Sequence, residues 1–197
     1  MAKKRSRPFA WYRVAIVGAV VVLGVVALLA AHGPVWWQRL YHPLKYTDQI
    51  AVASRRFGVD PFLVAGIIKV ESGFDPVIES RAGAVGLMQL LPSTARAVAG
   101  GRSAHLPPAT EAALKDPGTN TLYGTAYLSQ LMADFDDTRT ALAAYNAGPN
   151  NVEKWLKRPG GKKMTYADVA FPETKKYVKR VLFEAYYYRR LYPEAFK

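Results

Sequence analysis

Glu71 is the side chain in this sequence that is best placed to transfer a proton. It ends an apolar run over residues 62–72, and at helical spacing Leu63 and Ile67 lie on the same face as its carboxyl group. A carboxylate that faces a core is costly unless it is paired, neutralised or used. Partial desolvation and the negative end of the helix dipole both raise its pKa, as a general acid working near neutral pH requires. The competing interpretation is a glutamate at a frayed helix end that reaches into water.

The sequence around Glu71 contains the signals that begin and end a helix. Asp60-Pro61 offers a capping acid followed by proline at the first helical position. Gly73 and Pro76 follow the glutamate and end the helix there. We therefore expect the carboxyl group at the C-terminal end of this helix.

Helical patterns fill most of the chain after residue 46. Thr47 can cap a helix over residues 48–57, which Gly58 ends, and similar signals predict the later helices. These helices cover residues 92–100, 117–134, 138–146, 149–155 and 173–191.

The segments between the helices are predicted to be loops. Residues 80–86 and 159–163 are rich in glycine, and a small β-hairpin near residues 77–87 stays open. The predicted class is mainly α, with one compact domain over residues 47–197.

The composition excludes several kinds of chemistry. The sequence contains no cysteine, so disulfides, thiol catalysis and cysteine–zinc sites are ruled out. Its three histidines (His32, His42 and His105) form no helical pair of the kind that binds a metal. A site built from carboxylates alone stays open, although no spacing predicts one. We expect no metal and no cofactor.

The N-terminal region has the pattern of a membrane anchor. Basic side chains crowd residues 1–13, and no acid precedes Asp48. Residues 14–31 are uncharged and apolar, and their length suits a membrane-spanning helix with the basic flank on the cytoplasmic side. Trp36 and Trp37 would lie at the far interface.

This pattern predicts four parts. They are a cytoplasmic tail (1–13), a transmembrane helix (14–31), a stalk (32–46) and an exported domain (47–197). The alternative is a signal peptide cleaved near the small residues Ala27, Ala30 and Ala31, which would release a secreted protein.

The net charge of +12 is concentrated at the N-terminus. From Asp48 onward, 20 lysines and arginines stand against 15 acids, which is close to +5. This modest excess suits an anionic wall polymer or a membrane surface. We expect no nucleic-acid partner, because membrane topology already accounts for the densest basic cluster.

Three short signatures stand in order along the predicted domain. They are Glu71-Ser72, then Gly-Leu-Met-Gln at 86–89, then Ala-Tyr-Asn-Ala-Gly at 144–148. Together they resemble the catalytic domain of the soluble lytic transglycosylase family, lysozyme-like enzymes that cleave bacterial peptidoglycan. The resemblance runs from Tyr46 to Tyr192, and further positions agree with it: Pro92, Thr94, Asp116-Pro117, Asn120, Gly124, Tyr127-Leu128, Pro172-Glu173-Thr174 and Tyr177-Val178.

The sequence departs from the family pattern at three positions. Leu91 stands where a methionine is common and Thr121 where an isoleucine is usual, and both are changes in packing. Lys175 stands where an arginine is frequent, which weakens what the family implies for the nearby Glu173.

The resemblance implies a lysozyme-like α-helical domain that acts on the glycan strands of peptidoglycan. In the family, the glutamate aligned with Glu71 is the sole catalytic acid and base. It protonates the glycosidic oxygen between N-acetylmuramic acid and N-acetylglucosamine. It then takes the proton of the muramoyl 6-hydroxyl, which closes onto C1 as a 1,6-anhydro product. The 2-acetamido group is thought to stabilise the intermediate, which removes the need for a second carboxylate.

The resemblance also implies substrate-binding residues. Ser80 is expected to bond the acetamido group of the sugar or the glutamate itself. The hydroxyl of Tyr145 is expected to approach the catalytic carboxylate, and Asn146 to hold the substrate.

Three further residues are candidates for the cleft. Met88 would form an adaptable apolar wall, and Gln89 an amide for acetamido or hydroxyl groups. As a bare pair they would more often be a core residue and a surface residue. Glu173 is carried over as a cleft residue, although an acid in the first turn of a helix also compensates the helix dipole.

Other residues compete with these assignments. Asp75 and Glu79 are the nearest acids to Glu71, but breaks in the helix remove Asp75 from its face, and turn roles fit both better. Residues 186–188 are three tyrosines that could stack on sugars, yet helical spacing assigns at least Tyr188 to the core.

Two alternative functions stay open. A hydrolytic lysozyme on the same scaffold would yield reducing ends, and a non-catalytic protein would only bind the wall. An intact Glu71 argues against the second, because a degenerate copy has no physical reason to keep a buried acid.

Overall fold

The computed structural model describes residues 10–100, 106–135, 137–156 and 169–197. The chain divides into two compact units, residues 1–43 and 44–197. The predicted loop at 159–163 and most of the predicted basic tail lie outside the described residues.

The first unit consists of two helices, α1 (Ala10–His32) and α2 (Val35–Tyr41). Within α1, Trp11–Leu29 is long and apolar enough to cross a membrane, and none of it is buried inside the protein. The segment predicted as a stalk contains α2, where the rings of Trp36 and Trp37 meet edge to face at 5.7 Å.

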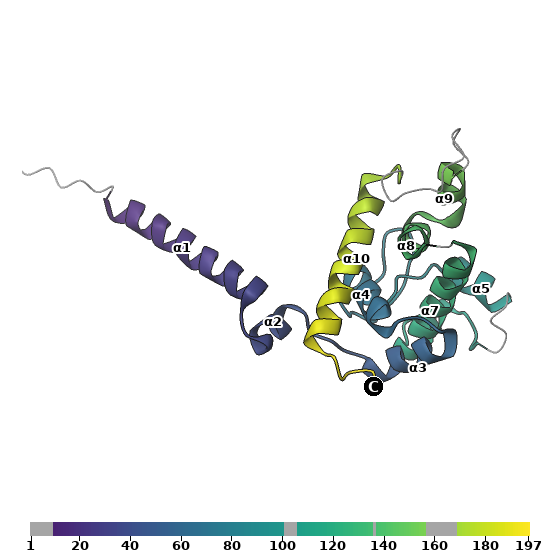
Figure 1. Cartoon of the computed structure of the whole chain (residues 1–197). Coiled ribbons are helices and arrows are strands. Elements are labelled where there is room, and N and C mark those ends of the chain that lie inside the picture. Colours follow the sequence, from purple (N-terminus) through teal and green to yellow (C-terminus); the bar gives the residue numbers. More distant parts are fainter. Residues whose placement is uncertain (1–9, 101–105, 136, 157–168) are drawn as a thin grey trace, which may run out of the picture. The chain divides into compact units, whose positions relative to one another are not determined.

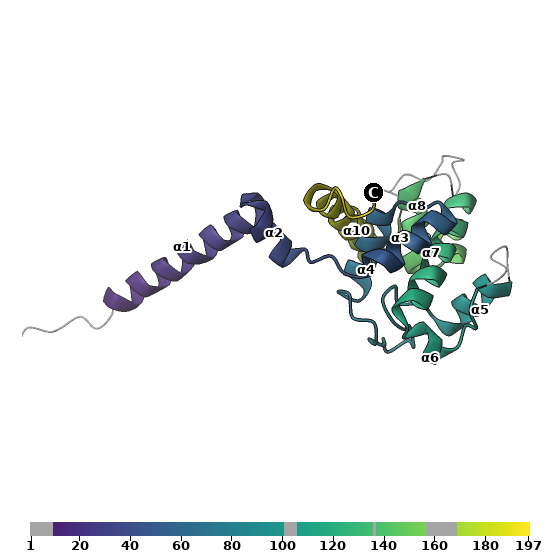
Figure 2. The ribbon, with the colours of Figure 1, turned by 90° about the horizontal axis from the view of Figure 1, so that it is seen from below.

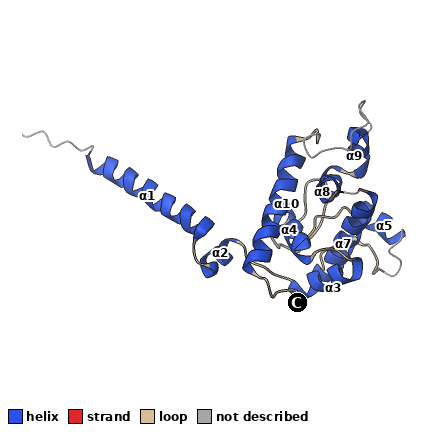
Figure 3. Cartoon of the chain, in the orientation of Figure 1, coloured by secondary structure: helices blue, strands red, loops and turns tan. Residues whose placement is uncertain are grey.

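The second unit is built from helices, as Figure 3 shows, and its described residues contain no strand. The predicted β-hairpin is reduced to isolated bridges that pair Val85 with Glu79 and with Leu90. The helices are α3 (Thr47–Phe57), α4 (Pro61–Glu71), α5 (Pro92–Gly100), α6 (Glu111–Leu114), α7 (Pro117–Asp134), α8 (Thr138–Ala147), α9 (Pro149–Leu156) and α10 (Pro172–Leu191).

Two of the three predicted helix caps are present in the structure. The Asp60 carboxylate accepts a hydrogen bond from the Phe62 backbone N–H at 3.1 Å, and Pro61 occupies the first helical position. Asp116 caps α7 in the same way. The predicted Thr47 cap is wrong, because Tyr46 is the N-cap residue in a left-handed conformation and makes no side-chain cap.

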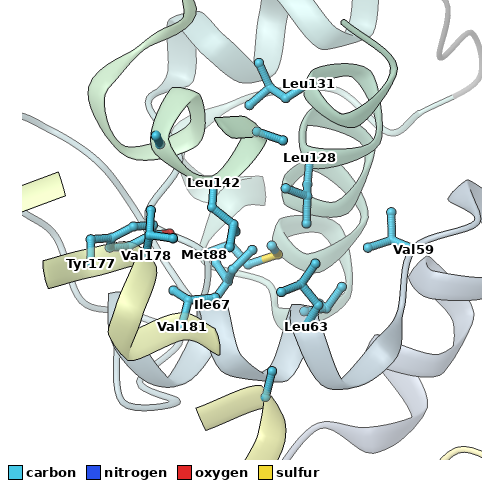
Figure 4. Close-up of a cluster of buried hydrophobic side chains, with 14 of the residues drawn as sticks. Val59, Leu63, Ile67, Met88, Leu128, Leu131, Leu142, Tyr177, Val178 and Val181 are labelled. Atoms are coloured by element: carbon cyan, nitrogen blue, oxygen red, sulfur yellow. The ribbon is translucent and has the colours of Figure 1, made fainter. Parts of the chain in front are cut away.

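Helix α4 runs through the middle of the domain and packs mainly against α10 (Figure 1). Gly66 lets the two backbones approach closely, since a Cβ atom there would lie 2.7 Å from the carbonyl oxygen of Val181. Figure 4 shows the side chains that fill this core, among them Ile67 from α4 and Val181 from α10. The packing fixes the position of the last turn of α4, where Glu71 lies.

The remaining helices enclose the other side of the domain. Helices α5 and α6 pack on α7, and Figure 2 shows them away from α10. A second, smaller core with Leu90, Val98 and Tyr123 lies between these elements. The segment between α4 and α5 connects the two cores, and it carries the family signature at residues 86–89 together with Ser72.

Candidate active site

A cleft of about 520 Å³ opens beside the end of α4. Its lining comes from five parts of the fold: the last residue of α4, the segment between α4 and α5, and helices α5, α7 and α8 with the residue after α8. The lining residues are Glu71, Ser80, Ala82, Ala84, Gln89, Leu90, Leu91, Thr94, Tyr127, Tyr145, Asn146, Ala147 and Gly148. Of the seven predicted site residues, five line this cleft: Glu71, Ser80, Gln89, Tyr145 and Asn146.

Glu71 is largely buried at the C-terminal end of α4. Burial raises the pKa of its carboxyl group to about 7, and the nearby Tyr177 hydroxyl partly offsets that rise. The predicted rise of the pKa and the predicted contribution of desolvation are confirmed. A carboxyl group with this pKa can both donate and accept a proton near neutral pH.

Ser72 fixes the end of α4 to the segment that follows it. Its hydroxyl donates to the Leu87 backbone carbonyl at 2.8 Å and accepts from the Phe74 backbone N–H at 3.1 Å. The side chain therefore joins the Glu71-Ser72 signature to the signature at 86–89, and it holds the glutamate against the wall of the cleft.

Asn120 holds the 86–89 segment from below. Its Oδ1 accepts from the Met88 backbone N–H at 2.7 Å, and its Nδ2 donates to the carbonyls of Val85 and Leu114, both at 2.8 Å. Gly86 makes room for this amide with a φ of 78°, because a Cβ atom at residue 86 would collide with the Asn120 side chain.

Two tyrosines from different helices lie close to Glu71. The pKa of the Tyr145 and Tyr177 hydroxyls is raised well above its usual value by burial, and the negative charge of Glu71 adds to both shifts. The Tyr145 hydroxyl donates to the Met88 backbone carbonyl at 2.9 Å, so its hydrogen points there and not to the carboxylate. The centroid of its ring lies 5.3 Å from that of the Tyr127 ring, and both residues line the cleft.

Tyr177 is the tyrosine that faces the carboxylate. Its hydroxyl has no partner of good hydrogen-bond geometry in the described part of the chain, yet it is close enough to Glu71 to lower the pKa of the acid. In the sequence, Tyr177 stands out only as a match to the family pattern. Helical spacing carries no signal for the direction of its hydroxyl.

Ser80 and Gln89 present polar groups to the cleft. The Ser80 hydroxyl accepts from the Ala84 backbone N–H at 3.0 Å, which leaves its own hydrogen available to a ligand. Gln89 has a φ of 48°, and its amide nitrogen donates to the carbonyls of Ile78 and Gly86, each at 3.1 Å. Its side-chain nitrogen is thus occupied, and its oxygen is the group that can accept.

Asn146 is exposed at the end of α8, and α10 holds its side chain. The Thr174 hydroxyl donates to Asn146 Oδ1 at 2.9 Å. With the oxygen held in this way, the Nδ2 group of the amide is free to donate to a ligand in the cleft.

Two predicted site residues lie elsewhere. Met88 does not form a cleft wall, because its side chain is fully buried in the core with its sulfur near the Thr125 hydroxyl; only its backbone serves the site. Glu173 lies exposed in the first turn of α10 and outside the residues that line the cleft, where it compensates the helix dipole.

The competing acids also lie away from the cleft. The Asp75 carboxylate caps a turn by accepting from the Val77 backbone N–H at 3.0 Å. Glu79 is exposed and forms an ion pair with Lys115 at 3.7 Å. Among the cleft residues that the structure describes, Glu71 is the one acid. Nor do the described histidines and acids gather into a group that could hold a metal ion.

The chain is similar to known proteins over most of its length. Residues 48–167 match the model of the transglycosylase SLT domain. The soluble lytic murein transglycosylase of Escherichia coli is 35% identical over 151 residues, which cover 74% of this chain and 23% of that protein. The membrane-bound lytic murein transglycosylase C of Actinobacillus pleuropneumoniae is 32% identical over 145 residues, which cover 70% of this chain and 38% of that protein.

Solved structures agree with these sequence matches. An inactive mutant of the lytic transglycosylase Slt from Pseudomonas aeruginosa, with glutamine in place of a glutamate, superposes with a TM-score of 0.70 at 31% identity; the match covers 82% of this chain and 27% of that one. The 70 kDa soluble lytic transglycosylase of Escherichia coli superposes with a TM-score of 0.68 at 32% identity, over 82% of this chain and 27% of that one.

The chain spans about a quarter of the length of the first curated relatives that it matches. The shared part is the helical, lysozyme-like domain that carries the cleft. The family model covers more than half of the chain, and the relatives exceed 30% identity over more than two thirds of it. The chain therefore belongs to the transglycosylase SLT domain family.

Proposed function

We propose that this protein is a peptidoglycan lytic transglycosylase that cleaves the β-1,4 bond between N-acetylmuramic acid and N-acetylglucosamine and leaves a 1,6-anhydro end. The observation that supports this most is the state of Glu71. It is a largely buried carboxyl group with a pKa of about 7 in a cleft where no second acid lies among the described residues. Such a group can serve as acid and base in turn, whereas a pair of carboxylates would suit the usual glycosidase mechanism.

The reaction needs one proton to move twice. Protonated Glu71 donates to the glycosidic oxygen as the bond from that oxygen to C1 of the muramoyl sugar breaks. The resulting carboxylate then accepts the proton of the 6-hydroxyl of the same sugar as O6 bonds to C1. Glu71 ends protonated, and no water is consumed. Burial favours the neutral acid before the first step, and the nearby Tyr177 hydroxyl stabilises the carboxylate formed between the two steps.

The other cleft residues supply complementary polar groups. Ser80 and Asn146 have hydrogens to donate, which suits carbonyl oxygens of acetamido groups. Gln89 has an oxygen to accept, which suits an acetamido N–H or a sugar hydroxyl. Tyr127 and Tyr145 offer rings in the wall of the cleft. We assign substrate binding to these residues, and a contact of Glu173 with a longer glycan stays a prediction.

The test is product analysis with a matched acid variant. Purified wall is digested by the protein and by Glu71→Gln, which keeps the shape of the side chain and removes the proton. We expect anhydro muropeptides from the first and a loss of at least about a hundredfold in the second, because general acid–base groups contribute about 10²–10⁴ to rates. Normal cleavage by Glu71→Gln would contradict the role of this residue.

The same digest separates the enzymatic alternative. A hydrolytic lysozyme would yield products heavier by one water, with reducing ends. A protein that only binds the wall would bind purified glycan tightly in both forms and release no products from either. The similarity to relatives named lytic murein transglycosylases favours the anhydro product.

We also propose that α1 anchors the protein in the membrane, with the domain on the extracytoplasmic side for remodelling of the cell wall. The length and apolar character of Trp11–Leu29 support this, and cleavage as a signal sequence is the alternative. N-terminal sequencing of the protein from the membrane fraction tests it. An intact N-terminus in that fraction is expected, and a mature protein that begins after α1 in the soluble fraction would contradict it.

A further inference from the structure

Helix α10 has a face that neither the core nor the cleft uses. Its buried side chains, among them Tyr177, Val181 and Ala185, belong to the side that packs on α4 and α8. The basic-aromatic face is made of Lys176, Lys179, Arg180, Phe183, Tyr186, Tyr187 and Arg190. At about 100° per residue, these seven positions fall within an arc of about 120°. Six of the seven are exposed, and Tyr187 is half-buried.

Three aromatic rings form the centre of this face. Phe183 and Tyr187 lie 4.6 Å apart between ring centroids, and Tyr186 lies 5.7 Å from Tyr187. The exposed fractions of Phe183 and Tyr186 are 52% and 60%. Large aromatic rings that are exposed to this extent are typical of a surface that meets a partner.

Basic side chains flank the rings at both ends. Lys176, Lys179 and Arg180 precede them, and Arg190 follows with its guanidinium 6.0 Å from the Tyr187 ring. Within the part of the chain that the structure describes, these four cations form no ion pair. The acids of α10, Glu173 and Glu184, fall outside the arc.

Arg189 shows that not every cation on α10 lacks an ion pair. It lies on the same helix but outside the arc, where it forms an ion pair with Asp60 and packs 5.2 Å from the Phe62 ring. Arg189 is thus paired within the described part of the fold, whereas the four cations of the face are not.

We propose that the basic-aromatic face of α10 docks on an anionic phospholipid surface. Aromatic rings that are apolar at one end suit the headgroup boundary, and lysine and arginine side chains bond lipid phosphates around them. From Lys176 to Arg190 the face extends over about 21 Å, so all four cations can reach the surface while the helix lies flat on it. The wall polymer is also anionic, so the test below separates lipid from glycan.

The segment between α1 and α3 is short enough to keep the domain near a lipid surface. Residues 33–46 connect α1 to α3, and even a fully extended segment of that length spans only about 50 Å. With α1 in a bilayer, the domain cannot move farther than this from the lipid surface. The proposal rests on the proposed anchoring by α1 and not on the catalytic assignment, because no residue of the face lines the cleft.

The absence of cysteine gives a direct test with the full chain. Tyr186→Cys places a fluorophore on the face, and Glu153→Cys places a matched fluorophore on the exposed side of α9. Each protein is reconstituted through α1 into nanodiscs of phosphatidylcholine, with or without phosphatidylglycerol, that contain a lipid with a nitroxide on its headgroup. We expect quenching at residue 186 with phosphatidylglycerol, at least about threefold more than at residue 153, and its loss at about 0.5 M salt.

Charge reversal identifies the side chains responsible. Lys179→Glu with Arg180→Glu should reduce quenching at residue 186 to the level at residue 153. Arg96→Glu with Arg139→Glu changes the same number of charges at exposed positions on α5 and α8 and should leave the quenching unchanged. Thermal unfolding shows whether both double variants fold. If one does not, the comparison of quenching with and without phosphatidylglycerol still tests the proposal.

Several results would overturn the proposal. Equal quenching at the two positions, or quenching that does not depend on phosphatidylglycerol, would mean that the face does not recognise anionic lipid. A change in the fluorescence at residue 186 on addition of purified glycan, without quenching by lipid, would assign the face to the wall. A change that depends on protein concentration would assign it to a second copy of the chain.

Discussion

The hydroxyl of Tyr177 on α10 faces the carboxyl group of Glu71 at the end of α4, and each changes the proton affinity of the other. The tyrosine lowers the pKa of the acid, while the charge of the acid adds to the rise in the pKa of the tyrosine. The close approach of α4 and α10 at Gly66 brings these two groups together. The packing of two helices is thus coupled to the chemistry of the cleft.

The pKa of Glu71 predicts how activity depends on pH. The first step needs the protonated acid, and with a pKa of about 7 its population falls tenfold per pH unit above that value. We expect kcat/KM on soluble glycan to fall along an alkaline limb centred near pH 7. Glu153→Gln removes an exposed acid on α9 and should leave the limb in place. A limb near pH 4.5 would show that Glu71 titrates as an ordinary exposed glutamate.

Tyr177→Phe should move that limb to higher pH. Removing the hydroxyl removes the polar group that lowers the pKa of Glu71, so the acid stays protonated to higher pH. The measurement is the pH profile of kcat/KM, with Tyr186→Phe as the control because Tyr186 is exposed on the same helix. A limb that stays in place, or moves to lower pH, would mean that the Tyr177 hydroxyl does not act on this acid.

Glu71 also predicts a dependence of stability on pH. The folded state holds the proton up to about pH 7, whereas the unfolded chain releases it near 4.5. Between these values only the folded state is protonated, so the free energy of unfolding falls as pH rises and the loss is complete above pH 7. The shift corresponds to about 3 kcal/mol at most. Glu71→Gln should remove this dependence and unfold at a higher temperature than the unaltered protein at pH 8. Equal melting temperatures at pH 8 would contradict the raised pKa.

Asn120→Ala should destabilise the domain and reduce its activity. The change leaves the Met88 N–H and the carbonyls of Val85 and Leu114 without their buried partner. An unsatisfied buried group costs about 1–3 kcal/mol, so we expect a loss of at least about 2 kcal/mol in denaturant unfolding. Asn150→Ala, at an exposed position on α9, is the matched control and should have little effect. Equal stability of the two variants would mean that the 86–89 segment does not depend on Asn120.

Local signals in the sequence predicted the helices that carry the site. Asp60-Pro61 and Asp116-Pro117 gave two helix starts, because capping acids and proline act within one turn. Helical spacing placed Glu71 against the core, and desolvation follows from that position. Thr47 failed as a cap because the left-handed Tyr46 takes that position, which no neighbouring residue reveals.

The remainder of the site depends on contacts between distant segments. Met88 turns into the core because Asn120, 32 residues away, holds its backbone and Gly124 leaves space for its side chain. The hydroxyl direction of Tyr177 depends on how α10 packs on α4, and Thr174 holds Asn146 across 28 residues. Periodicity predicts which face of a helix is buried, but it does not predict which group of another helix that face meets.

Gly66→Ala tests whether the contact between α4 and α10 sets the site. The added Cβ atom would lie 2.7 Å from the Val181 carbonyl oxygen and 3.1 Å from the Ala185 nitrogen. Both are backbone atoms, so a change of side-chain rotamer cannot relieve the clash. Overpacking of this kind costs about 1–3 kcal/mol, and we expect that loss in denaturant unfolding together with reduced kcat, because the separation of Glu71 and Tyr177 changes. Gly100→Ala meets nothing within 4 Å and should be neutral or slightly stabilising. If Gly66→Ala matched Gly100→Ala in both stability and kcat, the close approach of the two helices would not be what positions the acid.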